Sequence, residues 1–403
     1  MCCRPLQALS AAATAVLLVA IALAGGTGEP ALRAAQTQAT DTASSLRTPW
    51  GEPDFQGIWS VALLVPLERP EGVATAFYTA EQQAELDRRR AEFSVFGNHV
   101  RAERGTEADV AGAYNAVFTS QRPTGRRTGM VIDPPGGRVP PITPEARARQ
   151  AAIDEYQQAL MQNTVVCRDG LPGCPGEYGP PSPRREEQPP YYSVSNINRA
   201  DGPEDRSLGE RCMSGNLPTF RGGFTGIHIR VVQSPGAVSI FYDVGQGQGF
   251  NRVIPITDAP HLPPHVRQWW GDSRGRWEGD TLVVDVTNFS EKRDFRGSRE
   301  NLHLIERWRR TGPDSMELVT TVEDPTVWTR PWTVIQDFAR QPDEPNRIYY
   351  EPRCHEGNYG LPGLLIGARA EERAYEEGQG PHPATRCIAS CSSPEGRDPL
   401  ALR

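Results

Sequence analysis

The sequence has no excess of positive charge and almost no lysine. Its 43 Lys and Arg residues are outnumbered by 50 Asp and Glu residues, the formal net charge is -7, and Lys292 is the only lysine. Nucleic-acid binding depends on a basic surface that neutralises phosphates, so we expect no nucleic-acid partner. We interpret the shortage of lysine as the coding bias of GC-rich DNA rather than as a functional feature.

Recognisable cofactor and metal motifs are also missing. No motif for haem, flavin, nicotinamide or pyridoxal is visible, so we expect no cofactor. His261 and His265 have the i, i+4 spacing of a helical chelate, but Pro263 and Pro264 between them exclude a helix. We therefore expect no metal.

One long apolar run is present, at the N-terminus. Arg4 precedes an apolar segment from Leu6 to Ile21, and Ala22-Leu23-Ala24 follows as a small-residue cleavage site. This pattern predicts a secretory signal peptide over residues 1–24, because the run is short for a membrane span. We expect residues 25–45 to be disordered and the mature protein to be periplasmic or secreted, with no membrane contact after cleavage.

Six cysteines remain after the predicted cleavage, and an exported protein is expected to oxidise them. Their spacing favours the pairs Cys167–Cys174 and Cys387–Cys391, which leaves Cys212–Cys354. Six cysteines allow 15 pairings, so the sequence alone does not choose among them. The alternative for Cys387 and Cys391 is a zinc site, but no second pair or histidine sits at ligand spacing.

Residues 46–205 are predicted to form an N-terminal arm with two helices and a hairpin. Thr79 and Gln82 make a capping box before a helix that ends near Phe93. Thr143-Pro144 starts a second helix that runs to about Gln162. Residues 128–132 and 138–139 flank a Pro- and Gly-rich turn and predict the hairpin.

Residues 206–360 are predicted to form an antiparallel meander that closes into a lipocalin-like barrel of about eight strands. Short β-branched and apolar segments follow one another without helical crossovers, and closure would remove exposed sheet edges. The expected strands span 227–233, 238–244, 252–257, 281–289, 302–310, 316–322, 332–339 and 347–353. Residues 361–403 are expected to form a short helix and a loose tail. The chain is thus predicted to be mainly β.

Several longer motifs run through the mature chain, among them TPWGEPDFQGIW, GDSRGRWEGDTLVV, TVEDPTVWTRPW and CHEGNYGLP. Together they resemble a family of secreted bacterial proteins whose activity is uncharacterised. The resemblance covers nearly the whole mature chain. It implies an exported, soluble protein with a lipocalin-like second half, and it implies no catalytic residue.

Strand alternation marks Glu306 as a candidate site residue. Leu302, Leu304, Glu306 and Trp308 share one face of a predicted strand, since side chains alternate with period two. If that face points inward, Glu306 is a carboxylate in an apolar interior. One interpretation is that Glu306 is a catalytic or ligand-binding carboxylate. The alternative is that it pairs with a buried cation, for which Arg252 is a candidate. His303 falls on the opposite face and is expected at the surface.

Two other segments contain polar residues that could move a proton. His355 and Glu356 follow the last predicted strand and form either a proton-transfer pair or a strand-end cap. Residues 271–275 match the G-x-S-x-G pattern of a hydrolase, but that pattern needs a strand–turn–helix context. A polar turn is the interpretation that we favour for it.

These observations leave three hypotheses, and the oligomeric state stays open. The first is a protein that binds a small apolar or aromatic molecule in the barrel. The second is a cofactor-independent lyase, isomerase or hydrolase that uses Glu306, His355 or Glu356 on the same barrel. The third is a structural protein without a pocket. Under the first two, the expected ligand-binding residues are Tyr242, Arg252, Asp272, Trp277, Trp328, Trp332 and Tyr359.

Overall fold

A computed structural model describes most of the chain. The described residues are 46–61, 63–93, 122–171, 174, 176–192, 197–208, 210–213, 217–220, 227–244, 249–341, 357 and 359–385. All of them except residues 46 and 47 belong to one unit, Thr48–Arg403.

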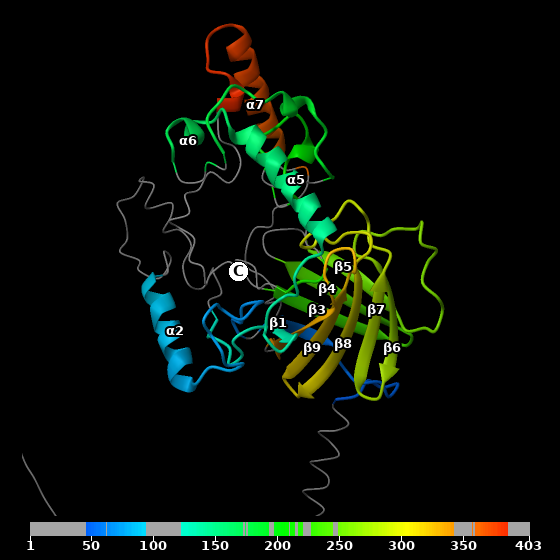
Figure 1. The fold of residues 1–403 in the computed structure, drawn as a ribbon. Helices are drawn as coiled ribbons and strands as arrows, with labels where there is room; N and C mark the ends of the chain where they lie inside the picture. Colours follow the sequence, from blue (N-terminus) through cyan, green and yellow to red (C-terminus); the bar gives the residue numbers. More distant parts are fainter. Residues whose placement is uncertain are drawn as a thin grey trace, which may run out of the picture. The chain divides into compact units, whose positions relative to one another are not determined.

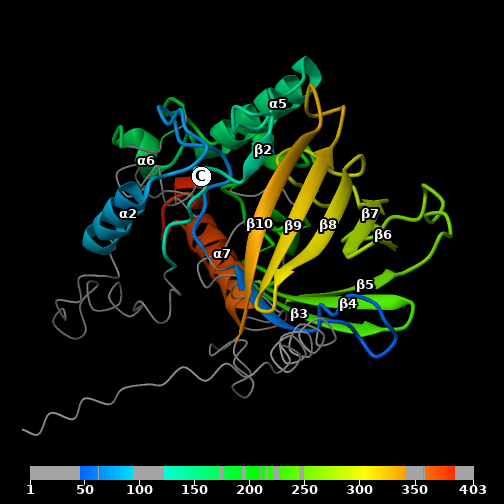
Figure 2. The ribbon, with the colours of Figure 1, turned by 90° about the horizontal axis from the view of Figure 1, so that it is seen from below.

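The central element is one antiparallel sheet (Figures 1 and 2). Its nine strands pair in the order β5-β4-β3-β1-β10-β9-β8-β7-β6, and every neighbouring pair is antiparallel. The strands are β1 Gly57–Val61, β3 Ile227–Ser234, β4 Ala237–Val244, β5 Phe250–Pro255, β6 Asp272–Glu278, β7 Thr281–Thr287, β8 His303–Gly312, β9 Ser315–Glu323 and β10 Trp332–Arg340. A tenth strand, β2 Val131–Asp133, pairs with β10 outside this path.

The sheet curls until its two ends, β5 and β6, lie side by side (Figure 2). An odd number of antiparallel strands leaves the two end strands parallel, so they cannot form an ordinary antiparallel pair. One parallel bridge joins Ile256 to Gly275, and the Thr257 amide donates to the Gly275 carbonyl at 3.0 Å. The predicted antiparallel barrel is confirmed, and we call this β5–β6 junction the seam.

The strand predictions were mostly correct, with two additions. Seven of the eight predicted segments form strands, and the eighth, at residues 347–353, lies outside the described residues. The barrel sheet also contains β1, which comes from the segment assigned to the N-terminal arm and lies between β3 and β10. It contains β6 as well, whose polar residues had suggested a turn rather than a strand.

Alternation along the strands produces the core. On β9, for example, Met316, Leu318, Thr320 and Val322 are buried and the residues between them are partly exposed. Period-two alternation directs one set of side chains into the barrel and the other set outward. The fully buried Trp59, Trp308 and Trp332 are the largest side chains of this core.

Among the described residues, three α-helices lie between β1 and β3 in the chain, and a fourth follows β10. They are α2 Ala80–Phe93, α5 Pro144–Met161, α6 Val165–Arg168 and α7 Gly360–Glu376. The predicted capping box is present: the Thr79 amide donates to Gln82 at 2.8 Å and the Gln82 amide donates to Thr79 at 3.2 Å. The Thr143 hydroxyl accepts from the Ala146 amide at 3.1 Å, which confirms the second predicted helix start.

The predicted hairpin is wrong in its pairing. Residues 134–137 do form a turn, with the Gly137 amide donating to the Pro134 carbonyl at 2.9 Å. However, β2 pairs with β10 and not with residues 138–139. The partner is long-range, and local turn signals carry no information about it.

One predicted disulfide is present, between Cys167 and Cys174. Cys212 is disulfide-bonded as well. Cys354, which spacing suggested as its partner, lies outside the described residues, as do Cys387 and Cys391. Within the described part of the chain, no helix has the length and hydropathy needed to cross a bilayer.

A substitution at Gly275 tests whether the seam requires close packing. A Cβ added there would lie 2.8 Å from Ile254 Cγ2 and 2.8 Å from Ile256 Cδ1, which is closer than carbon atoms can approach. We therefore expect Gly275→Ala to lower the free energy of unfolding by about 1–3 kcal/mol, as overpacking does elsewhere. Denaturant unfolding measures the change. Gly136→Ala is the control, because a Cβ there meets nothing within 4 Å; equal stability of the two variants would contradict the packing requirement at the seam.

Candidate functional site

A buried ion pair crosses the barrel interior. Glu306 on β8 faces inward between Leu304 and Trp308, as alternation predicted, and is 2% exposed. Arg252 on β5 is 4% exposed, and its Nη1 donates to both carboxylate oxygens of Glu306, at 3.0 and 2.8 Å. The ion pair joins β5, which lies at the seam, to β8, which is separated from the seam by β6 and β7.

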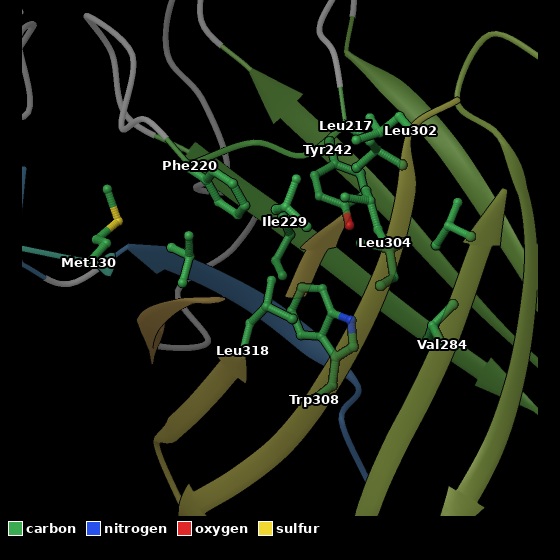
Figure 3. Close-up of a cluster of buried hydrophobic side chains, with 14 of the residues drawn as sticks. Met130, Leu217, Phe220, Ile229, Tyr242, Val284, Leu302, Leu304, Trp308 and Leu318 are labelled. Atoms are coloured by element: carbon green, nitrogen blue, oxygen red, sulfur yellow. The ribbon is translucent and has the colours of Figure 1, made fainter. Parts of the chain in front are cut away.

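Three further groups hydrogen-bond to this pair. Arg252 Nε donates to the Ser273 hydroxyl on β6 at 2.9 Å, and Nη1 lies 3.5 Å from the Tyr242 hydroxyl on β4. The Trp308 indole donates to Glu306 Oε2 at 3.0 Å. Figure 3 shows Tyr242 and Trp308 among the surrounding apolar side chains, including Leu304 and Ile229. We call Arg252, Glu306, Tyr242, Ser273 and Trp308 the interior cluster.

Electrostatics keep the interior cluster charged. Burial is the largest single effect on the pKa of Arg252 and lowers it, but the charges and hydrogen bonds of Glu306 and Tyr242 together outweigh burial, and the net shift is upward. Burial raises the pKa of Tyr242, so the phenol stays protonated. The Glu306 carboxylate accepts hydrogen bonds from Arg252 Nη1 and from the Trp308 indole, so both of its oxygens are already engaged within the cluster.

Several buried polar groups have no hydrogen-bond partner among the described residues, and two of them lie beside the ion pair. Arg252 Nη2 is one, and the other is the hydroxyl of Thr320, which lies directly opposite Glu306 in the β8–β9 register. Buried polar groups in folded proteins are nearly always hydrogen-bonded, and leaving one unsatisfied costs about 1–3 kcal/mol. These two groups therefore retain the capacity to hydrogen-bond to a further group.

Three aromatic rings connect the interior cluster to the surface. Tyr242 stacks on Phe250 and Phe250 stacks on Trp270, each with ring centroids 4.6 Å apart. Tyr242 and Phe250 are buried, and Trp270 is partly exposed. The stack thus reaches from the solvent to the Tyr242 hydroxyl beside Arg252.

A second polar cluster lies on the outer side of β6 to β9. His261 Nδ1 is 2.8 Å from Asp272 Oδ2, and His261 Nε2 is 3.0 Å from Asp285 Oδ1. The same Asp285 oxygen lies 3.1 Å from His303 Nε2, and His303 Nδ1 is 3.0 Å from Glu323 Oε2. Arg274 begins the row by donating to Asp272 Oδ1 at 2.7 Å. We call these six residues the outer row.

Contacts within the outer row shift the pKa values of His303 and Asp285. The hydrogen bond to Asp285, followed by the charges of Asp285 and Glu323, outweighs burial and raises the pKa of His303. The pKa of Asp285 is lowered, chiefly by the hydrogen bond to His303. Among the described residues, no group of three or more His, Cys, Asp or Glu side chains is arranged to hold a metal ion.

Sequence reasoning did not find the outer row. It placed His303 at the surface, where the side chain is indeed 30% exposed, and gave it no partner. One signal was available, because Asp285, His303 and Glu323 are outward-facing residues on three consecutive strands, and His303 and Glu323 pair directly in the register. His261 sits in an irregular loop, and no local pattern brings it to them.

The predicted site residues fall into several places. Glu306, Arg252 and Tyr242 come together in the interior cluster, whereas Asp272 belongs to the outer row. Trp328 and Trp332 pack against each other in the core, with ring centroids 5.5 Å apart.

The remaining predicted residues lie elsewhere. Trp277 packs against Phe55, with ring centroids 5.5 Å apart. Tyr359, just before α7, is 95% exposed. His355 and Glu356 are outside the described residues.

Ser273 does not occupy a hydrolase nucleophile position. It lies within β6, its hydroxyl accepts from Arg252, and β7 follows through a tight turn rather than a helix. The strand–turn–helix context that the G-x-S-x-G pattern requires is absent from this well-described region.

Two small cavities are described, and neither is lined by Arg252 or Glu306. One cavity, of about 30 Å³, lies beside the middle of β10, between the part that pairs with β2 and the part that pairs with β1. Its lining includes Met130, Phe220 and Gln336. The other, of about 60 Å³, lies between α7 and the segment around Asn198. Both are far smaller than the usual small-molecule pocket of about 300–1,000 Å³.

Comparison with known proteins identifies no family. No family model and no curated protein matches the chain. Among solved structures, Caenorhabditis elegans lipid binding protein 8 is 7% identical, with a TM-score of 0.20, over 29% of this chain and 71% of its own.

Two further structures give similar values. A mutant of the fluorescent protein UnaG is 11% identical, with a TM-score of 0.21, over 33% of this chain and 85% of its own. Secretory abundant heat soluble protein 4 from Ramazzottius varieornatus is 9% identical, with a TM-score of 0.21, over 34% of this chain and 83% of its own. TM-scores this low support no inference about the chain.

The buried ion pair makes a clear prediction about stability. Glu306→Gln removes the negative charge and leaves the Arg252 guanidinium buried without a counter-charge, which costs about 3–5 kcal/mol in comparable pairs. We expect a loss of that size in denaturant unfolding. The double variant Arg252→Met/Glu306→Gln should recover a large part of it, because no unpaired charge remains. A double variant as unstable as the sum of the two single variants would contradict this account.

Proposed function

We propose that the chain is an exported protein that binds a small, mainly apolar or aromatic molecule with one neutral hydrogen-bond acceptor inside its barrel. The observation that carries the proposal is the unfilled hydrogen-bonding capacity of Arg252 Nη2 and the Thr320 hydroxyl, next to a fully buried ion pair. A carbonyl or hydroxyl oxygen of a guest would satisfy these groups.

The charge balance of the interior cluster favours a neutral guest. Glu306 already balances the charge of Arg252 at 2.8 Å. A second anion would be buried without a counter-charge, at a cost of several kcal/mol. A ketone, an amide or a phenol is therefore favoured over a carboxylate of the same shape.

The aromatic stack favours a flat guest. Tyr242, Phe250 and Trp270 already pack face to face at 4.6 Å, so a further ring can replace or extend one of these contacts. Because the described cavities are not lined by the interior cluster, a guest larger than a water must displace side chains. We therefore expect single-ring molecules rather than long lipids.

Export is supported by the predicted signal peptide and by the Cys167–Cys174 disulfide, since disulfides persist in oxidising compartments. N-terminal sequencing of the protein recovered from a secreting host should begin at Gly25, directly after the predicted cleavage site. Recovery of protein that still carries residues 1–24 would contradict export by this route.

A matched pair of probes tests the binding proposal. Acetophenone and benzoate have similar shapes but differ in charge. We expect acetophenone to raise the melting temperature in proportion to its binding, as any ligand of the folded state does, and benzoate to have no effect. Thr320→Val should weaken acetophenone binding by about fivefold, the value of one hydrogen bond. Thr321→Val is the control, because the Thr321 hydroxyl contacts Thr333 on the outer side.

Two results would overturn the proposal. One is that no neutral single-ring compound changes the melting temperature, in which case a packed structural barrel is the better description. The other is that Thr320→Val and Thr321→Val change binding equally, which would place the bound molecule elsewhere.

A further inference from the structure

The outer row connects a loop to four strands. His261 lies in the segment 256–271, which joins β5 to β6 and so spans the seam. Its ring contacts Asp272 at the start of β6 and Asp285 on β7, and the row continues through His303 on β8 to Glu323 on β9.

The contacts of the two histidines require extra protons. Each of the four ring nitrogens lies 2.8–3.1 Å from a carboxylate oxygen. An ionised carboxylate only accepts hydrogen bonds, so each nitrogen must donate one, whereas a neutral imidazole has a single N–H. Two neutral rings supply two of the four hydrogens, and two further protons are needed.

The charges of the outer row balance when those two protons are bound. Asp272, Asp285 and Glu323 contribute three negative charges, and Arg274 contributes one positive charge. When both histidine rings are protonated, the net charge of the outer row is zero. Loss of the two extra protons leaves a net charge of -2. The next outward cations on β8 do not disturb this balance, because Arg307 pairs with Glu278 at 2.7 Å and Arg309 pairs with Glu317 at 3.2 Å.

We infer that the outer row is a proton-binding site in which His261 and His303, held between three carboxylates, bind two protons and thereby fasten the loop across the barrel seam. The side chains of His261, Asp285, His303 and Glu323 are 26–34% exposed, so protons can exchange with solvent. This inference goes beyond guest binding in the barrel and does not depend on it.

The direction of the pH dependence follows from the perturbed groups. The folded pKa of His303 is raised, so its contribution to stability is complete below the ordinary histidine value of about 6.5 and is lost as pH rises through the raised value. The folded pKa of Asp285 is lowered, so its contribution is present above the ordinary aspartate value and is lost only as pH falls through the lowered value. The fastening is therefore strongest in mildly acidic solution and weakens towards alkaline pH.

The loop has a second attachment that does not titrate. Asn288 Nδ2 donates to the carbonyl of Leu262 at 2.7 Å and to that of Val266 at 3.3 Å, and the Gln268 amide donates to the Asn288 carbonyl at 2.8 Å. These bonds are independent of pH, so variants of the histidines are expected to fold and to keep the loop near the sheet.

The test is a stability profile of the full mature chain between pH 5 and 9 at constant ionic strength. We expect the unfolding equilibrium constant of the wild type to rise on the alkaline side, by about tenfold for each unit by which folding raises the pKa of His303. His303→Gln should flatten this rise. His265→Gln should not, because His265 lies exposed in the same loop and outside the outer row.

Nitrogen NMR of the imidazole rings gives a second, independent readout in the wild type. At pH 6, both ring nitrogens of His261 and His303 should show protonated shifts, because each of the four nitrogens lies against a carboxylate oxygen. Overturning results are a profile that the His265→Gln and His303→Gln variants change equally, or ring nitrogens that are unprotonated at pH 6. Either result would reduce the outer row to an ordinary surface hydrogen-bond network.

Discussion

The seam between β5 and β6 is the constraint on which the rest of this structure depends. Nine strands in an antiparallel order bring two parallel ends together, and the backbone supplies one bridge there, between Ile256 and Gly275. A full ladder would have provided several hydrogen bonds along the junction. Side chains therefore hold the two ends together, one set inside the barrel and one set outside.

Strand β6 contributes side chains to both the inner and the outer set, because its side chains alternate between the two faces of the sheet. Ser273 and Gly275 face inward, where Ser273 accepts from Arg252 on β5 and Gly275 leaves room for the isoleucines of the opposite end. Asp272 and Arg274 take part in the outer row. The polar segment that matches a hydrolase pattern is therefore a strand that closes a barrel, and its polarity follows from its place at the junction.

The two polar clusters differ because their access to water differs. The interior cluster is almost fully buried, and its two charges are paired at 2.8 Å. The histidines and carboxylates of the outer row keep about a quarter to a third of their side-chain surface, apart from the nearly buried Asp272, so protons reach them. The guest site that we propose lies in the buried cluster, and the proton-binding site that we propose lies in the exposed row.

Local patterns were sufficient for most of the strands, for the starts of two helices and for the inward direction of Glu306. Period-two alternation placed Glu306 in the interior and suggested Arg252 as its partner, and capping residues located the starts of α2 and α5. These features depend on neighbours within a few residues, which a single sequence displays. The disulfide between Cys167 and Cys174 was also predictable, because the two cysteines lie close together in the chain.

Long-range pairing was decided by the tertiary structure alone. The insertion of β1 between β3 and β10 joins residues that are far apart in sequence, and no local preference encodes which strand edge a short apolar segment will meet. The same holds for His261, which reaches Asp285 and His303 only because the barrel closes and brings the loop over the sheet. The sequence by itself determined seven of the strands and which of their faces are apolar. The order of the strands, and with it β6, the seam and both polar clusters, arose from burying those faces together.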